Sequence, residues 1–188
     1  MQETQVEMTV FEAILARRCV RNYTERVVDL GAIHILLEAA IHGPTALHEE
    51  PWTFAIIRDK ELLKDISDYA KPLFAGELQI AGRAPGSFTE PDFNIFYDAS
   101  TLILICSKQT GSCVAADCWL AAENLMLAAC AMKLGSCVIG AALTALNTPD
   151  IKVKLNIPEN FLLLSRLFLV TQMGRHPLLG ERNLSLSH

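Results

Sequence analysis

Four arginines within ten residues make the segment 17–26 the most positive part of a chain whose net charge is -5. Arg17, Arg18, Arg21 and Arg26 share this segment with a single acid, Glu25. Guanidinium groups form paired, charge-assisted hydrogen bonds with phosphates and carboxylates. The arginines also follow a predicted helix, whose negative C-terminal end cations stabilise. The spacing therefore indicates either an anion site or a helix cap.

Two other segments combine small residues with polar ones. The run 43–52 reads Gly-Pro-Thr-Ala-Leu-His-Glu-Glu-Pro-Trp, and its small side chains would allow a flat ligand to approach closely. The alternative is an ordinary loop, with His48 on the surface and Trp52 as the first core residue of a strand. The run 134–140 reads Leu-Gly-Ser-Cys-Val-Ile-Gly. Its glycines would bring backbone N–H groups near a ligand, although Gly135 is also typical of a helix cap.

Hydrophobic periodicity and capping signals predict the elements that must position these segments. Thr9 and Glu12 form a capping box, and Asp29 caps a second helix that ends at Gly43 and Pro44. Between residues 76 and 92 we expect a mobile loop with little regular structure. The predicted helices cover residues 10–17, 29–42, 59–72, 115–133 and 149–157, and the predicted strands cover residues 52–57, 102–106, 136–139 and 167–173.

The order of these elements favours an α+β fold, in which helices pack around one sheet in a single domain over residues 1–188. Strands and helices do not alternate regularly, and the chain has no internal repeat. It also contains no G-x-G-x-x-G or G-x-x-x-x-G-K sequence. The standard nucleotide-binding loops are therefore not expected.

Composition and charge exclude several classes of protein. An apolar content of 51% with 20% charged residues excludes intrinsic disorder. The negative net charge disfavours general binding to nucleic acids or to anionic membranes. The apolar stretch 114–134 contains Asp117, Glu123 and Lys133, so we predict no transmembrane helix. Because the N-terminus lacks the positive charge of a secretory signal, we expect a cytoplasmic protein. The cysteine and histidine spacings predict reduced thiols and no metal site.

Taken in chain order, these motifs resemble the FMN-dependent nitroreductase family over most of the chain. The family's Arg-Arg-Ser-x-Arg, followed by an aromatic residue, resembles residues 17–23, and its Pro-Ser-x-x-Asn-x-Gln-Pro-Trp resembles residues 44–52. Its central helix resembles residues 121–129, and the Leu-Gly-Ser turn resembles residues 134–140. Each motif is weakly specific. Four motifs in the right order favour the family over the cap and loop alternatives.

The resemblance implies a nitroreductase-like fold with a central mixed, mainly antiparallel sheet, in an intertwined homodimer with two FMN molecules at its interface. The arginine segment would bind the flavin phosphate and ribityl chain, the segment after the second helix would reach the flavin from the other subunit, and the glycine turn would face flavin N5. The implied cofactor-binding residues are Arg17, Arg18, Cys19, Arg21, Pro44, Thr45, Ala46, His48, Ile139, Gly140 and Arg182, with Arg175 as the alternative to Arg182.

The implied function is an FMN-dependent oxidoreductase. Hydride would pass from NAD(P)H through flavin N5 to a nitroaromatic, quinone or similar small-molecule acceptor, in a ping-pong cycle. No side chain need act as an acid or base, and Arg21 is expected to stabilise the negative charge of reduced flavin.

Three residues depart from the family pattern. Cys19 replaces a serine and is a weaker hydrogen-bond donor to phosphate. His48 and Glu50 replace amides, and a carboxylate at position 50 would oppose the charge of reduced FMN. Two alternatives therefore stay open: a flavin-binding or flavin-handling protein without turnover, and a cofactor-free interaction dimer of the same fold.

Overall fold

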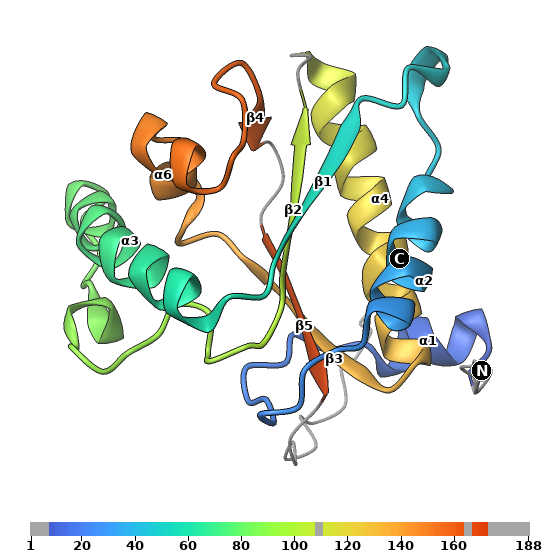
Figure 1. Ribbon diagram of the computed structural model, residues 1–188, viewed down its shortest axis with the longest axis horizontal. Helices are drawn as coiled ribbons and strands as arrows, with labels where there is room; N and C mark the ends of the chain where they lie inside the picture. The colour runs from blue at the N-terminus through green and yellow to red at the C-terminus, as the bar shows by residue number, and fades with distance from the viewer. Residues whose placement is uncertain (1–7, 108–110, 164–166, 173–188) are drawn as a thin grey trace, which may run out of the picture.

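The computed structural model describes residues 8–107, 111–163 and 167–172 (Figure 1). Helices and strands occur in the predicted order, which confirms the α+β class. The α-helices are α1 (Val10–Ala16), α2 (Leu30–Ile41), α3 (Lys60–Ile80), α4 (Ser112–Ala131), α5 (Leu143–Leu146) and α6 (Pro149–Lys154). The strands are β1 (Trp52–Ile57), β2 (Leu102–Ser107), β3 (Leu134–Ile139), β4 (Leu162–Leu163) and β5 (Leu167–Gln172), and the 3-10 helices are η1 (Ala46–His48) and η2 (Gly86–Thr89).

The strands form one sheet in the order β1-β2-β5-β3, with β4 paired to β2. The ladders between the described strands are antiparallel; Trp52 lies opposite Ser107, and Leu134 lies opposite Gln172. Outside the named strands, a parallel bridge joins Cys19 to Ser136. The predicted mainly antiparallel character of the sheet is therefore confirmed for the described strands.

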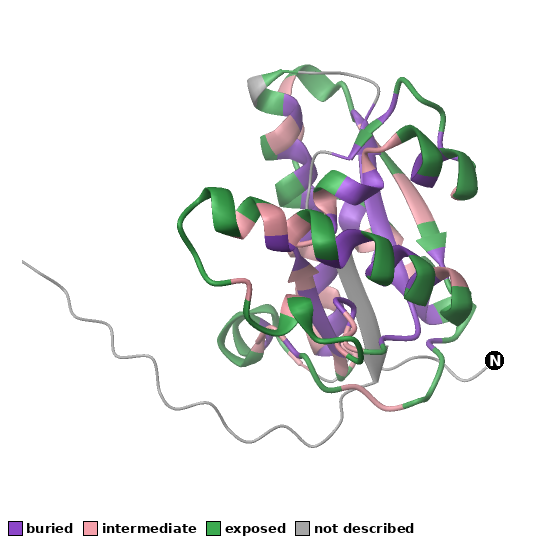
Figure 2. Cartoon of the chain, turned by 90° about the vertical axis from the view of Figure 1, so that its left-hand side faces the viewer, coloured by how far each residue is buried: buried purple, intermediate pink, exposed green. Residues whose placement is uncertain are grey.

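Strand β2 is buried along its whole length because helices cover both faces of the sheet. Its alternate residues pack into two different cores, as the two-residue period of a strand requires. Leu102 and Leu104 join the core beneath α3, α5 and α6, and Ile103 and Ile105 join the core beneath α2 and α4. Figure 2 shows the buried residues concentrated in the strands and on the inner sides of the helices.

The helix α4 runs along one face of the sheet and contacts α1, α2 and β3. Its residues Ala121, Ala122 and Leu125 are buried against α2 and the strands. By length and composition, α4 is the one described helix that could cross a membrane, and the buried core helix of a globular protein has the same properties. Its packing against α2 and the sheet is that of a core helix.

The helix α3 does not end near Pro72 as predicted but continues to Ile80. A proline inside a helix removes one backbone hydrogen bond and crowds the preceding turn. Pro72 is exposed, so water can solvate the carbonyl group that loses its partner. The residues on either side of it, Ala70, Lys71 and Ala75, are buried. Tertiary packing on both sides of the proline therefore maintains the helix.

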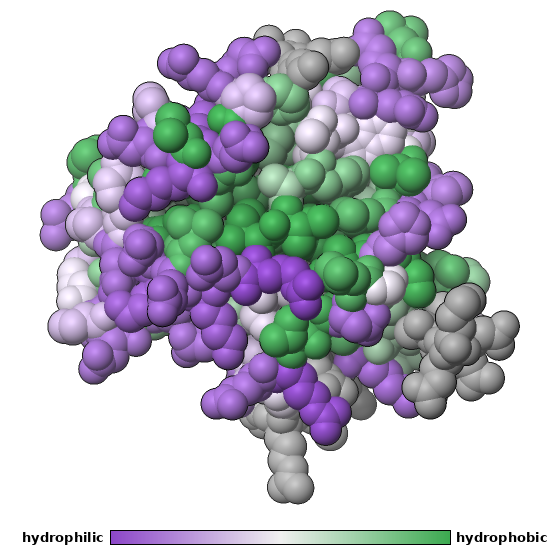
Figure 3. All heavy atoms as spheres, in the orientation of Figure 1, coloured by the Kyte–Doolittle hydropathy of each residue, from purple (hydrophilic) through white to green (hydrophobic). Residues whose placement is uncertain are grey.

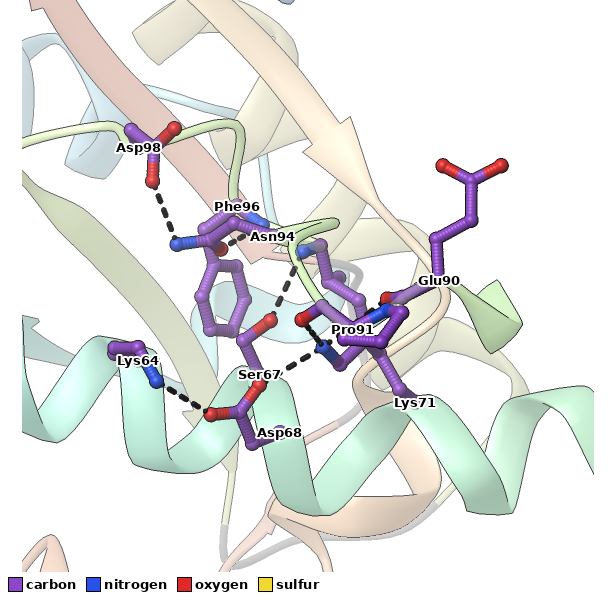
Figure 4. A network of polar contacts seen from close by, with 10 residues as sticks. Lys64, Ser67, Asp68, Lys71, Glu90, Pro91, Asn94, Phe96 and Asp98 are labelled. Carbon is purple, nitrogen blue, oxygen red and sulfur yellow. Dashed lines mark hydrogen bonds and ion pairs between the residues drawn. The ribbon is translucent and has the colours of Figure 1, made fainter. Parts of the chain in front are cut away.

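The segment predicted to be a mobile loop contains the last turn of α3 and the 3-10 helix η2, so that prediction was wrong for part of its length. Side chains of α3 hold the following residues in place (Figure 4). The buried Lys71 ammonium donates to the Pro91 carbonyl at 2.8 Å and pairs with Asp68 at 2.9 Å. The Ser67 hydroxyl accepts from the backbone N–H of Ile95 at 3.0 Å.

Gly135 does not cap α4, which corrects the sequence-based expectation. The cap is Met132, and Lys133 adopts the left-handed conformation with a φ of 58°. Gly135 instead lies in β3 opposite Thr171, so the strand begins two residues earlier than predicted. The short elements α5 and β4 were not predicted. Met173, the predicted end of the last strand, lies outside the described residues.

Candidate functional site

Arg21 and the end of β3 line the same cavity, which has a volume of about 420 Å³. Ile139 and Gly140 form the wall that continues into α5. Phe74 and Glu77 reach the cavity from α3. Three of the sequence-predicted site residues, Arg21, Ile139 and Gly140, are therefore brought together although more than a hundred positions separate the first from the others.

A chain of aromatic rings forms one wall next to Arg21. The Arg21 guanidinium lies over the Tyr97 ring, 5.9 Å from its centroid. Edge-to-face contacts then connect Tyr97 to Phe93, Phe93 to Phe88 and Phe88 to Phe74, with centroid distances of 5.9, 5.4 and 4.7 Å. Aromatic faces beside a fixed cation suit a flat ligand that carries negative charge.

The other two arginines of the motif have partners inside the chain. The Arg17 Nε atom lies 3.3 Å from the Glu123 carboxylate. The Arg18 guanidinium donates to the carbonyl groups of Leu15 and Arg17 at 2.7 and 2.8 Å. Arg18 thus caps the C-terminal end of α1, which is the role that the helix-cap alternative predicted. In the described chain, Arg21 is the arginine of the motif that lines the cavity.

The residue between these arginines joins the segment to β3. Cys19 forms the parallel bridge with Ser136, and the Val20 N–H donates to the Ser136 carbonyl at 3.0 Å. A hydrogen bond from Cys137, together with the charges of Arg17 and Arg21, lowers the pKa of the Cys19 thiol despite its partial burial. This connection places Arg21 beside the end of β3.

Tyr23 follows the motif and is partly buried against the core that contains Cys137. Its hydroxyl group is buried and has no hydrogen-bond partner among the described residues. Burial is the main cause that raises the pKa of this phenol above its ordinary value. A buried hydroxyl without a partner is costly. Tyr23 lines a separate cavity with Asn94 and Phe96, not the cavity that Arg21 lines.

The segment that contains Pro44, Thr45, Ala46 and His48 lies at the opposite end of α2 from the arginine segment (Figure 1). The twelve residues of α2 separate the two segments by about 18 Å at the usual helical rise. The Ala46 N–H donates to the carboxylate oxygens of Asp117 on α4, at 3.2 and 3.3 Å. Within one chain, these four predicted residues do not meet Arg21.

The backbone of this second segment is unusual. Leu47, His48 and Glu50 have φ values of 54°, 56° and 45°. These values lie in the left-handed region, which residues other than glycine rarely adopt. Leu47 is also 88% exposed. Residues held in such conformations concentrate where a protein contacts a ligand or a partner. The strain and the exposed leucine together indicate a contact surface.

The sequence matches the Nitroreductase family over residues 14–169, which is most of the chain. This chain belongs to the Nitroreductase family. It is 30% identical to a protein provisionally named NADH dehydrogenase/NAD(P)H nitroreductase from Methanothermobacter thermautotrophicus, over 82% of this chain and 72% of the relative. A protein of the same name from Archaeoglobus fulgidus is 30% identical over 81% of this chain and 79% of the relative.

The fold of this nitroreductase-family chain agrees with that of solved structures. The crystal structure of a nitroreductase with bound FMN from Bacteroides fragilis superposes with a TM-score of 0.81 at 24% identity, and the alignment covers 95% of each chain. This likeness confirms the predicted nitroreductase-like fold. The predicted family is confirmed as well.

Sequence reasoning missed the residues that complete the cavity of this nitroreductase-family chain. Tyr97, Phe88 and Glu77 lie in or beside a segment that was predicted to be irregular. No spacing signal in the sequence marks them, because they meet only where α3 and the residues after it pack together. Arg182 and the alternative Arg175 lie outside the described residues.

Proposed function

We propose that this chain is an FMN-dependent oxidoreductase that transfers hydride from NAD(P)H to a nitroaromatic, a quinone or a similar organic acceptor. The main support is the cavity that joins Arg21 with Ile139 and Gly140. Two relatives carry NAD(P)H nitroreductase in their names, and a structural neighbour contains FMN. Membership of the Nitroreductase family supports a nitroreductase-type oxidoreductase.

The residues around the cavity fit FMN in size and chemistry. A volume of about 420 Å³ lies within the range of small-molecule and cofactor sites. Arg21 supplies a positive charge at one wall, and the aromatic rings supply an apolar wall. A flat, negatively charged ligand therefore suits this site.

Each part of the cavity would have a separate role. When bound, FMN would supply a ring that accepts hydride at N5 from NAD(P)H and donates it to the acceptor. Arg21 would stabilise negative charge at the site. The aromatic wall formed by Tyr97 and Phe88 would orient a flat acceptor and exclude water. Beyond the lining of this cavity, Arg17 and Cys19 would bind the phosphate and ribityl end, with Arg182 or Arg175, and the N–H groups of Arg18 that do not cap α1 would add to them.

We further propose that the site is completed by a second copy of this chain. The helix α1 turns its large apolar residues outward, and Val10, Phe11 and Leu15 are 69%, 79% and 73% exposed. An apolar groove between α1, α2 and α4 lies beside them. Figure 3 shows further hydrophobic residues across the middle of the face between α3 and α2. Large apolar interfaces are typical of permanent dimers.

In such a homodimer, Pro44, Thr45, Ala46 and His48 of one copy would contact the flavin of the other. Their distance from Arg21 within one chain and the exposed position of Leu47 support this arrangement. The proposal also includes one domain over residues 1–188 and a cytoplasmic location. The single sheet that contains all the described strands supports one domain. The six free cysteines support a cytoplasmic location, because thiols stay reduced there.

The cofactor test uses the purified full chain. Heat releases any bound ligand, and chromatography against FMN and FAD standards identifies it; we expect FMN. Anaerobic addition of NADH or NADPH should then bleach the flavin absorbance. FAD, or no flavin even after FMN is added, would refute the cofactor assignment. Bound FMN that neither nucleotide bleaches would instead favour a flavin-binding protein without turnover.

A further inference from the structure

Cys19 and Cys137 meet where the arginine segment joins β3: Cys137 lies in the core, and Cys19 packs against that core. Each thiol is the main influence on the pKa of the other. The backbone explains this proximity. Cys19 bridges Ser136, the residue that precedes Cys137 in β3. Paired strands lie about 4.8 Å apart and rise about 3.3 Å per residue, so the Cα atoms of Cys19 and Cys137, one step diagonal to the bridged pair, are about 5.8 Å apart. Disulfides join residues whose Cα atoms are about 4.4–6.8 Å apart. The two cysteines are thus placed where a disulfide could close with little movement of the backbone.

The two thiols differ in their access to solvent. Cys19 is partly exposed, whereas the Cys137 residue is 0% exposed. A reagent from solution therefore meets Cys19 first. Cys137 lies directly behind it, in the core that also contains Ile139. This arrangement resembles that of a reactive thiol with a resolving thiol, in which the second sulfur attacks the first after it has been oxidised.

The surroundings favour the charged form of Cys19. The hydrogen bond from Cys137 and the nearby charges of Arg17 and Arg21 lower the pKa of Cys19. The same hydrogen bond and burial raise the pKa of Cys137. The phenols of Tyr23 and Tyr97 are the other titratable groups of this cluster.

Two other buried cysteines, Cys106 and Cys118, have raised rather than lowered pKa values. Burial raises the pKa of Cys106 to about 12 and that of Cys118 to about 11. A thiol is nucleophilic as its thiolate. Among these buried and half-buried cysteines, Cys19 therefore combines solvent access with stabilisation of the reactive form.

We propose that Cys19 and Cys137 form a peroxide-responsive dithiol that closes reversibly to an intramolecular disulfide. The Cys19 thiolate attacks one oxygen of a hydroperoxide, the O–O bond breaks, and the other oxygen leaves with a proton as an alcohol or water. Cys19 is then a sulfenic acid. The Cys137 sulfur attacks the Cys19 sulfur, forms the S–S bond and releases water. The thiols together lose one electron pair, and the hydroperoxide gains it.

The proposed dithiol does not depend on flavin binding, because both sulfur atoms and both arginines belong to one chain. The disulfide should form in the flavin-free protein, and bound FMN should slow it, because the proposed function places the phosphate and ribityl end of FMN against Cys19. Peptide mass spectrometry detects it without any measurement of turnover. A chain that forms the disulfide but does not reduce bound FMN would therefore contradict the proposed function alone. A chain that reduces FMN but forms no disulfide would contradict the dithiol alone.

The test starts from the fully reduced chain with Cys113→Ser, which removes an exposed thiol from the start of α4. After treatment with hydrogen peroxide, free thiols are blocked with N-ethylmaleimide, and the tryptic peptides are analysed without reduction. We expect a cross-linked peptide pair that joins Cys19 to Cys137 and that dithiothreitol separates. In unoxidised wild-type protein near pH 6, Cys19 should react with N-ethylmaleimide roughly tenfold faster than Cys113.

Matched variants test the two roles separately. With Cys137→Ser, the sulfenic acid at Cys19 should accumulate and be trapped by dimedone. With Cys19→Ser, Cys137 should stay unmodified, and with Cys130→Ser the cross-link should form as before. Thermal unfolding checks that each variant folds. Oxidation of Cys19 to a sulfinic acid while Cys137 remains a free thiol would overturn the proposal, and so would a cross-link that involves Cys130.

Discussion

The two ends of α2 present two different kinds of candidate surface. At one end, Arg21 lies over the Tyr97 ring and shares a cavity with Gly140, so its partners come from the same chain. At the other end, Leu47 is exposed on a backbone with positive φ values, and Asp117 is the side chain that holds the segment. We call the surface around Arg21 the first surface and the surface around Leu47 the second surface. Folding of one chain is enough to assemble the first surface. The second is held in a costly shape that a partner would explain.

The arginine segment shows the same contrast on a smaller scale. Arg17 and Arg18 satisfy their guanidinium groups with Glu123 and with carbonyl groups at the end of α1, whereas Arg21 faces the cavity. Arginines only a few positions apart in the sequence therefore have different roles. Net charge along the sequence does not separate them, because the difference depends on which neighbours the fold supplies.

The largest expected effect comes from breaking the proposed contact between copies with Phe11→Glu. A charge in place of a large apolar residue at the centre of an interface should raise the dimer dissociation constant roughly a thousandfold. Flavin should be lost with it, because the second surface would no longer reach the first. Light scattering over a range of concentrations measures the mass, and flavin fluorescence measures the occupancy.

Ile80→Glu is the matched control, since Ile80 is 90% exposed at the end of α3, away from α1. This variant should keep the mass of the wild type. A wild-type chain that is monomeric with flavin bound at all concentrations would contradict the dimer and the separation of the site between two copies.

The second largest effect is expected at the first surface, from a substitution of Arg21. If Arg21 stabilises negative charge at the site, Arg21→Ala at saturating FMN should slow reduction by NAD(P)H roughly a hundredfold, or about 3 kcal/mol, and lower the reduction potential. Stopped-flow absorbance and a redox titration measure these quantities. Arg17→Ala is the control, and it should weaken FMN binding with little effect on either quantity. Equal rates and potentials in the Arg21 variant would make Arg21 an anchor only.

The smallest effect tests how the second surface is held. A Cβ atom at Gly43 would lie 3.0 and 3.1 Å from the backbone N and Cα of Ala121 on α4. Gly43→Ala should therefore push the end of α2 away from α4 and lower the free energy of unfolding by about 1–3 kcal/mol. Urea denaturation measures the change.

Gly76→Ala is the control, because Gly76 lies inside α3, where an added methyl group would meet no atom of a neighbouring element within 4 Å. Alanine favours a helix over glycine by about 1 kcal/mol, so this variant should be slightly more stable than the wild type. If Gly43→Ala matches the wild type in stability, the close approach of α2 to α4 does not hold the second surface.

Local signals in the sequence determined where several helices begin. Thr9 and Asp29 cap α1 and α2 as predicted, and Asp59 caps α3 at the start of the helix predicted from residue 59, because a cap depends on atoms only a few residues away. The order of the motifs also determined the family. These features do not require knowledge of how distant segments pack.

Contacts between distant segments were decided by the tertiary structure alone. Packing on both sides of Pro72 extended α3, and the bridge at Ser136 selected Arg21 rather than Arg18 for the cavity wall. Cys19 and Cys137 became neighbours in the same way. Sequence spacing cannot predict such contacts, because they arise when strands and helices far apart in the chain bury their apolar faces against each other.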